Sequence, residues 1–155
     1  MTEITLVDEL SPAQEAIMER DLVDYEASHG IDVNYKRFHL ILQNDQKKLI
    51  GVLTAYTAFA EVYIDDMWVH SAHRGSGYGR LLIASLENRF KSKGFNNINL
   101  CTNQFNAPEF YKKCGFELEF VRKNLKNPKL NKFFMVKFFD DEEQTQGILV
   151  EELPI

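Results

Sequence analysis

The hydrophobic positions near the start of the chain change from a strand-like to a helical pattern. Glu3–Val7 predicts a short first strand. Ser11, with Pro12 directly after it and Gln14 three residues later, predicts a helix start, because this combination satisfies free backbone donors of the first turn. Apolar residues at helical spacing continue this helix to about Ser28.

Three further runs rich in β-branched, leucine and aromatic residues predict consecutive strands. A polar stretch typical of a hairpin joins the first two, and the third follows almost directly, so the three should form an antiparallel meander. They cover residues 37–42, 49–59 and 61–69.

Helices and strands alternate in the second half of the chain. A helix is expected where Leu82, Ile83, Leu86 and Phe90 define one apolar face, and Gly94 follows its end. The remaining pattern predicts a strand at 97–101, a short helix with Asn106 as N-cap, and strands near 116–122 and 132–139. We therefore expect one α+β domain over residues 1–155 with a mixed sheet.

Three alternating glycines separate the third strand of the meander from the next helix, in Arg74-Gly75-Ser76-Gly77-Tyr78-Gly79. Glycines leave backbone N–H groups uncovered, and the helix N-terminus adds unsatisfied donors and the positive end of its dipole. With Arg74 and Arg80 beside it, the loop predicts a pyrophosphate site. A glycine-rich turn that binds nothing is the structural alternative.

Other phosphate loops fit this segment less well. A Walker loop ends in Gly-Lys-Ser/Thr, and a dinucleotide loop has its third glycine one residue later and an acid at the tip of the next strand. Residues 98–101 end without such an acid. A nucleotide-phosphate binder is kept as a rival hypothesis.

The loop resembles the coenzyme A signature of the GNAT superfamily of N-acetyltransferases, Arg/Gln-x-x-Gly-x-Gly/Ala, at Arg74, Gly77 and Gly79. Val69 matches the aliphatic residue that precedes this signature, and residues 107–116 resemble the family segment Ala-x-x-x-Tyr-x-x-x-Gly-Phe. The resemblance implies a mixed, largely antiparallel sheet flanked by helices in three α/β/α layers. It also implies acetyl-CoA as co-substrate and direct acetyl transfer to a primary amine of a small molecule or peptide.

The resemblance assigns roles to individual residues. Tyr111 would be the general acid, since a phenol with a pKa of about 10 can donate to a departing thiolate; an aromatic packing role is the alternative. The strand 67–69 would splay from its neighbour at 99–101 and offer backbone groups to the pantetheine arm. The expected cofactor-binding residues are Met67, Trp68, Val69, Arg74, Gly75, Ser76, Gly77, Tyr78, Gly79, Arg80 and Asn106.

A protonated amine needs a base before it can attack, and Asp65 and Asp66 are the candidates. Strand alternation sends adjacent side chains to opposite faces, so at most one should point at the acceptor. Glu61 is the reserve. A solvated edge or a salt bridge is the alternative for either aspartate.

Charge and composition narrow the remaining possibilities. A net charge of −5 without a long basic run disfavours nucleic acid, and no apolar run suits a signal peptide or a membrane span, so we expect a cytoplasmic protein. His70 and His73 lack further ligands at metal spacing, so no metal is expected. Residues 140–155 are acidic and then apolar, which leaves a homodimer open. A non-catalytic acyl-CoA-binding module on the same fold is the main alternative.

Overall fold

The computed structural model describes residues 1–139 and divides the chain into two compact units, Met1–Asn34 and Tyr35–Ile155. The first unit holds α1 (Pro12–Ser28). Ser11 Oγ accepts from the Gln14 N–H at 3.2 Å and Gln14 Oε1 accepts from the Ser11 N–H at 2.9 Å, which confirms the capping box. The prediction of a strand at Glu3–Val7 is wrong, because these residues form no strand in the structure. The composition of five residues can favour a strand, but a strand forms only where another strand pairs with it, and this segment has no such partner in the described residues.

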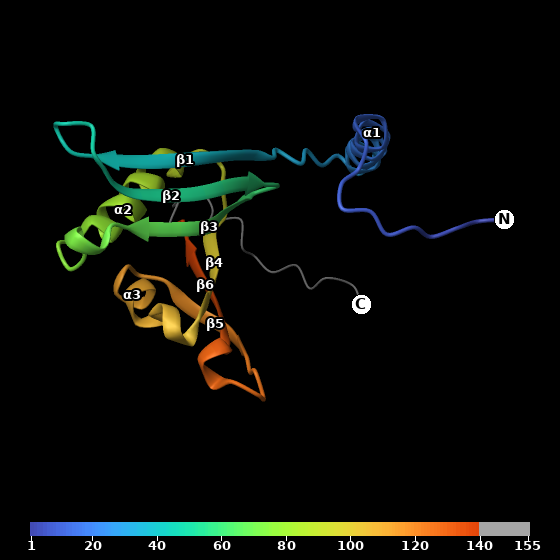
Figure 1. The fold of residues 1–155 in the computed structure, drawn as a ribbon. Helices are drawn as coiled ribbons and strands as arrows, with labels where there is room; N and C mark the ends of the chain where they lie inside the picture. Colours follow the sequence, from blue (N-terminus) through green and yellow to red (C-terminus); the bar gives the residue numbers. More distant parts are fainter. Residues whose placement is uncertain (140–155) are drawn as a thin grey trace, which may run out of the picture. The chain divides into compact units, whose positions relative to one another are not determined.

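The second unit is built on a six-stranded sheet in the order β1-β2-β3-β4-β6-β5 (Figure 1). β3 and β4 are parallel and every other neighbouring pair is antiparallel, so the predicted mixed, largely antiparallel α+β sheet is confirmed. The strands are β1 (Lys36–Gln43), β2 (Leu49–Ala58), β3 (Glu61–Val69), β4 (Asn97–Asn103), β5 (Glu117–Arg122) and β6 (Lys132–Phe138).

Helix α2 (Tyr78–Phe90) packs on β1, β2 and β3 through the apolar face that the sequence predicts. Leu82, Ile83 and Leu86 are buried in one cluster with residues such as Leu53 of β2. The three-layer arrangement stays a prediction, since α2 covers one face and α1 belongs to the first unit. The remaining helices are α3 (Pro108–Lys113) and the single turns η1 (Ser71–His73), η2 (Gln104–Asn106) and η3 (Pro128–Leu130).

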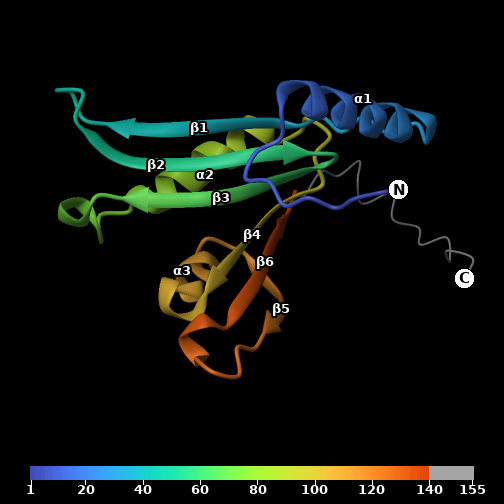
Figure 2. The ribbon, with the colours of Figure 1, turned by 45° about the vertical axis from the view of Figure 1, so that its right-hand side comes forward.

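The parallel strands β3 and β4 start side by side and then diverge (Figure 2). Their pairing runs from Glu61 opposite Asn97 to Ile64 opposite Leu100 and stops there. The rest of β3 stays paired to β2, so its other edge faces a gap. The splay is therefore present, but Asn99 and Leu100, expected to lie at the gap, belong to the paired part.

A β-bulge marks the point of divergence on β3. Thr54 of β2 is opposite Asp66, whereas the next residue, Ala55, is opposite Ile64, so Asp65 is the extra residue. A bulge bends its strand and re-aims the side chains that follow it. The bulge thus turns the second half of β3 away from β4.

In the described part of the chain, none of the helices is both long and apolar enough to cross a membrane. The acidic and apolar tail at 140–155 lies outside the described residues.

Candidate active site

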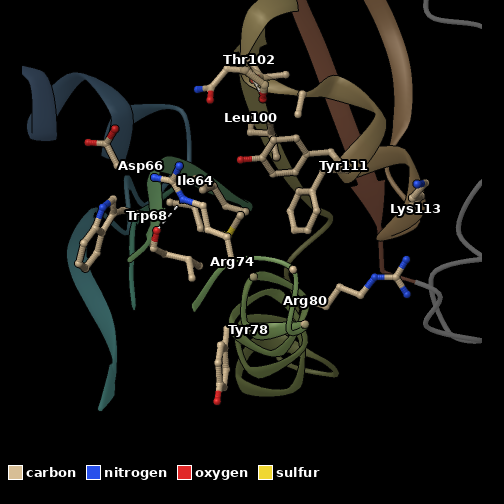
Figure 3. Close-up of a pocket in the computed structure, with 18 of the residues that line it drawn as sticks. Ile64, Asp66, Trp68, Arg74, Tyr78, Arg80, Leu100, Thr102, Tyr111 and Lys113 are labelled. Carbon is tan, nitrogen blue, oxygen red and sulfur yellow. Dashed lines mark hydrogen bonds between the residues drawn. The ribbon is translucent and has the colours of Figure 1, made fainter. Parts of the chain in front are cut away.

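A cavity of about 830 Å³ lies between the diverging half of β3, the glycine loop, the start of α2 and α3 (Figure 3). The predicted catalytic and cofactor-binding residues all line it except Ser76 and the reserve base Glu61. Figure 3 shows Asp66 and Trp68 on one side, Arg80 and Lys113 on the opposite side, and Tyr111 between them. We call the side with Asp66 the acidic end, where Arg74 also lies, and the side with Arg80 and Lys113 the basic end.

The glycine loop places free backbone donors on the cavity wall. Gly75 and Gly77 have φ of 79° and 85°, the left-handed region that glycine adopts without strain. Gly77 is the N-cap of α2, and no side chain caps the helix. The first N–H groups of a helix have no intrahelical partner, so those of residues 78–80 are available to an anion.

Gly79 serves close packing, a different purpose from that of the two glycines before it. A Cβ atom at this position would stand 2.9 Å from Phe110 Cζ and 3.5 Å from the terminal methyl of Met67. Gly79 therefore lets the first turn of α2 approach both α3 and β3.

Arg74 is tied to the end of β3. Its Nε donates to the backbone carbonyl of Val69 at 3.0 Å (Figure 3). The signature arginine thus holds the loop against the strand, and this bond uses one of the strand's free acceptors.

The backbone of Met67 and Val69 faces the gap between β3 and β4. The carbonyl of Trp68 lies toward β2, 3.1 Å from where a Cβ of Gly51 would stand. Backbone groups of successive strand residues point to alternate edges, so those of Met67 and Val69 point the other way. With the Val69 carbonyl occupied by Arg74, the two N–H groups and the Met67 carbonyl remain for a ligand.

Tyr111 stands between the two ends of the cavity and is largely buried. Its ring lies edge-on to Phe110 and Phe116, with centroids 5.2 and 5.9 Å away. Burial, with smaller contributions from Cys114 and Asp66, raises the pKa of Tyr111 to about 12. The phenol therefore stays protonated at neutral pH and is a hydrogen-bond donor there.

The two aspartates differ in their partners although they share a face of the sheet. Asp65 lies 3.4 Å from the guanidinium of Arg37. Asp66 makes no ion pair with any residue in 1–139, and its charge reaches Tyr111. The prediction that they point to opposite faces is wrong, because the bulge interrupts the alternation: Arg37 and Thr54, the neighbours of Asp65 and Asp66, lie on one face.

Glu61, the reserve base, lies away from the cavity at the paired end of β3 and β4. Its two carboxylate oxygens accept from Asn97 Nδ2 at 3.1 Å and Asn99 Nδ2 at 3.3 Å. These bonds hold the first residues of the two strands together. Glu61 therefore does not line the cavity, and its role as a reserve base stays a prediction.

The short helix α3 begins differently from the prediction. Ala107, with φ of 57°, is the N-cap, and no side chain caps the helix, so the prediction of Asn106 as N-cap is wrong. The left-handed Ala107 turns the chain before Pro108, and Asn106 stays on the cavity wall with its carbonyl accepting from Thr102 Oγ1 at 3.1 Å.

Several cavity residues were not predicted to be site residues. The sequence pattern did not single them out, because most of them are strand or helix residues of types that are equally common in a hydrophobic core. For one of them, Lys113, a signal existed: it lies two residues after Tyr111 in the segment that resembles the family motif. The missed residues are Ile64, His73, Leu100, Cys101, Thr102, Ala107, Phe110 and Lys113. Within residues 1–139 no group of three or more His, Cys, Asp or Glu side chains could hold a metal.

The profile of the acetyltransferase (GNAT) family matches residues 4–116. The chain belongs to the GNAT acetyltransferase family. This GNAT acetyltransferase is similar to the blasticidin-S acetyltransferase of Streptomyces morookaense, with 28% identity over 115 residues, 74% of this chain and 79% of that protein.

Solved structures of acetyltransferases have the same fold as this GNAT acetyltransferase. A crystal structure of an acetyltransferase from Bacillus cereus is 26% identical with a TM-score of 0.70, covering 86% of this chain and 97% of that one. An aminoglycoside 6′-N-acetyltransferase complexed with coenzyme A is 18% identical with a TM-score of 0.61, covering 90% of this chain and 98% of that one.

Proposed function

We propose that this GNAT acetyltransferase transfers the acetyl group of acetyl-CoA directly to a primary amine of a cationic acceptor. The observation that carries the proposal is the gap between β3 and β4, where free backbone groups of Met67 and Val69 border the same cavity as Tyr111 and the glycine loop. Family membership supports the acetyl transfer, and a solved structure of similar fold is complexed with coenzyme A.

The cofactor would span the cavity from its basic end to its centre. Backbone N–H groups of residues 78–80 would hold the pyrophosphate. The pantetheine arm would extend along the open edge of β3 and pair with Met67 and Val69 like an added strand. One of these N–H groups would polarise the acetyl carbonyl, which acquires negative charge when the amine attacks.

Proton transfers would be divided between Asp66 and Tyr111. Asp66 would take a proton from the ammonium, directly or through water, and free the nitrogen lone pair. The nitrogen would then attack the carbonyl carbon, and the C–S bond would break with its electron pair moving to sulfur. After the attack the nitrogen would lose a second proton and keep one as the amide N–H. The lost proton would reach the thiolate by way of Tyr111.

The raised pKa limits what Tyr111 would do. A phenol with a pKa of about 12 holds its proton more strongly than a thiol with a pKa of roughly 8.5. Tyr111 would therefore stabilise the leaving thiolate by a hydrogen bond, and full proton transfer through it would require a simultaneous proton from the amide nitrogen.

The acidic end of the cavity supports a cationic acceptor. Asp65 and Asp66 stand beside each other on one sheet face, and only Asp65 has an ion-pair partner in residues 1–139. An unpaired carboxylate attracts an ammonium group and disfavours an anionic acceptor. The relative named for blasticidin S and the one named for an aminoglycoside are consistent with a small-molecule amine.

Thermal unfolding combined with thiol release tests the proposal. Acetyl-CoA should raise the melting temperature, because a ligand that binds only the folded state stabilises it, whereas ATP and NAD should not. Thiol release should then depend on the amine in a panel of polyamines, aminoglycosides and peptides. Stabilisation without release across the panel would favour the non-catalytic module, and equal stabilisation by ATP would favour the nucleotide-phosphate binder.

A further inference from the structure

Two cations stand opposite each other where β5 ends and β6 begins. In the strand register Arg122, the last residue of β5, is the partner of Lys132, the first residue of β6. Side chains of directly opposite residues start about 5 Å apart, and like charges at such positions destabilise a sheet. Among the residues that the structure describes, neither cation makes an ion pair. An anion bound between them would remove this repulsion.

Both cationic groups are held over the same aromatic ring. The guanidinium carbon of Arg122 lies 5.2 Å from the centroid of the Phe134 ring, and Nζ of Lys132 lies 5.3 Å from it. Cation–π contacts keep the two charges near each other, and such cations bind a carboxylate through charge-assisted hydrogen bonds. The pair is therefore arranged for an anionic group before that group arrives.

The connection between β5 and β6 carries positive charge only. Residues 120–132 include five Lys and Arg but no Asp or Glu, in a chain whose net charge is −5. Asn124 orders this connection, because its Oδ1 accepts from the N–H groups of Lys126 and Asn127 at 3.1 and 2.9 Å. The cation pair thus lies in a positive field that a local carboxylate does not offset.

The cation pair lies on the same sheet face as Asp66. Residues that alternate along a strand, and residues that are partners across neighbouring strands, point to one face. By these two steps the face of Asp66 continues to the ring beneath the cations through Thr54, Tyr56, Tyr63, Asn99, Cys101 and Phe134. Cys101 also lines the cavity. The cavity therefore opens onto this face between the carboxylate and the two cations.

Donor and acceptor would reach the cavity from different faces. Helix α2, whose first turn would hold the pyrophosphate, packs against the face that carries Leu53 and Ile64. Asp66 and the cation pair belong to the other face. An acceptor with its ammonium at Asp66 would therefore extend along that face toward β6 and β5.

The sheet order sets the length of such an acceptor. Beyond β4, β6 and β5 are the second and third strands from β3 (Figure 1). Neighbouring strands are about 4.8 Å apart, so the ammonium and the anionic group would be roughly 10 to 15 Å apart. An extended peptide rises about 3.3 Å per residue, so this separation corresponds to roughly three to five residues.

We infer that Arg122 and Lys132 bind a carboxylate of the acceptor, and that the acceptor is a peptide N-terminus with Asp or Glu at roughly its fourth residue. This inference rests on the proposed function and deepens it, because Asp66 receives the ammonium that the proposed mechanism needs. The acceptor is then cationic where it reacts and anionic at its far end. The two cations would select the substrate without touching the reacting atoms.

Steady-state acetylation of matched peptides tests the inference. Two peptides, Ala-Ala-Ala-Glu-Ala-Ala and Ala-Ala-Ala-Gln-Ala-Ala, have free N-termini and amidated C-termini, and thiol release measures turnover. In the wild type kcat/KM should be about tenfold higher for the Glu peptide, the scale of one charge-assisted hydrogen bond. The difference should lie in KM, because the cations bind a part of the acceptor that does not react.

Charge reversal separates recognition from a structural role. In the double variant Arg122→Glu/Lys132→Glu the preference should invert, so that a third peptide with Lys at the fourth position becomes the best acceptor. Stabilisation by acetyl-CoA should persist, which shows that the variant is folded. The control is Lys126→Gln, which removes an exposed cation of the same connection that does not lie over Phe134. It should leave the preference unchanged.

Equal kcat/KM for the three peptides in the wild type, or an unchanged preference in the double variant, overturns the inference. Acetylation of polyamines but of none of the peptides overturns it as well, and in each of these cases the proposed function stands. Binding of a single-stranded RNA oligonucleotide that the double variant loses, without any peptide preference, would assign the pair to a phosphate backbone instead. If no amine releases thiol, the inference and the proposed function both fail.

Discussion

The two halves of β3 use their polar groups in opposite ways. Up to Ile64 the strand pairs with β4, and the carboxylate of Glu61 is bound by Asn97 and Asn99. From Asp65 onward the same edge faces a gap, and backbone groups and one carboxylate lack such partners in the described residues. Paired groups stabilise a sheet, whereas groups left unpaired beside a cavity are available to a ligand.

The difference originates in one extra residue. The bulge at Asp65 keeps β3 paired to β2 while it bends the strand from β4. The sheet therefore remains continuous on one side of β3 and opens on the other. Substitutions in the two halves should accordingly affect different measurements: stability in the paired half and turnover in the open half.

The largest effect should come from Asp66→Asn. Loss of the base should lower kcat/KM at least about 100-fold, the usual scale for general base catalysis. Stabilisation by acetyl-CoA should persist, since the glycine loop is unchanged. The control is Asp65→Asn, which removes a half-exposed carboxylate paired with Arg37 and should cost only a few-fold. A larger loss in Asp65→Asn would reverse the assignment of the two aspartates.

Tyr111→Phe should lower kcat by about tenfold to 100-fold, because the leaving thiolate loses its hydrogen-bond donor. The KM for acetyl-CoA should change little, since the ring and its packing remain. Tyr63→Phe removes a hydroxyl that does not line the cavity and serves as the control. Steady-state kinetics with the preferred amine measure both; unchanged turnover in Tyr111→Phe would leave Tyr111 as a packing residue.

Tyr111 should also make stability fall at high pH. Its pKa is about 12 in the folded protein, whereas an exposed tyrosine has a pKa of 10.0, so its contribution is complete below pH 10 and is lost as the pH rises toward 12. At pH 11 the loss relative to pH 8 should be on the order of 1 kcal/mol.

Urea unfolding at pH 8 and pH 11 measures this loss. Tyr111→Phe should reduce the loss, and the exposed Tyr25→Phe should not. Part of the loss should persist in Tyr111→Phe, because burial also raises the pKa of Tyr63 to about 12. Identical pH dependence in Tyr111→Phe and the wild type would show that the phenol is not held protonated by burial.

The smallest effect should come from Glu61→Gln in the paired half. The amide cannot accept from both Asn97 and Asn99, so the free energy of unfolding should fall by about 1 kcal/mol, while kcat stays unchanged. Glu109→Gln, in the exposed pair with Lys112, should change stability by less than about 0.5 kcal/mol. A drop in kcat for Glu61→Gln would restore it as a candidate base.

Much of this fold was predictable because the signals are local. The capping box at Ser11 and Gln14, the meander and the apolar face of α2 each depend on residues close in sequence, and the structure confirms them. The strand at Glu3–Val7 failed for the complementary reason. A strand needs a partner, and five residues of suitable composition do not contain one.

In the candidate site, too, features that depend on neighbouring residues were predictable and contacts between distant elements were not. The spacing of Arg74, Gly77 and Gly79 identified the loop, since phosphate-binding loops depend on consecutive backbone positions. The sequence could not show that Glu61 is bound by two asparagines from β4, or that Lys113 lies on the same cavity as Arg80. These are contacts between elements brought together by the sheet order.

The sequence by itself therefore determined most of the elements, the glycine loop and the family resemblance, because each depends on periodicity or on the spacing of neighbouring residues. Only the tertiary structure decided which of two adjacent aspartates is free. That outcome depends on the register of β3 against β2, where a single bulge places Asp65 and Asp66 on one face. It also depends on Arg37 of β1, which within residues 1–139 pairs with Asp65 and not with Asp66.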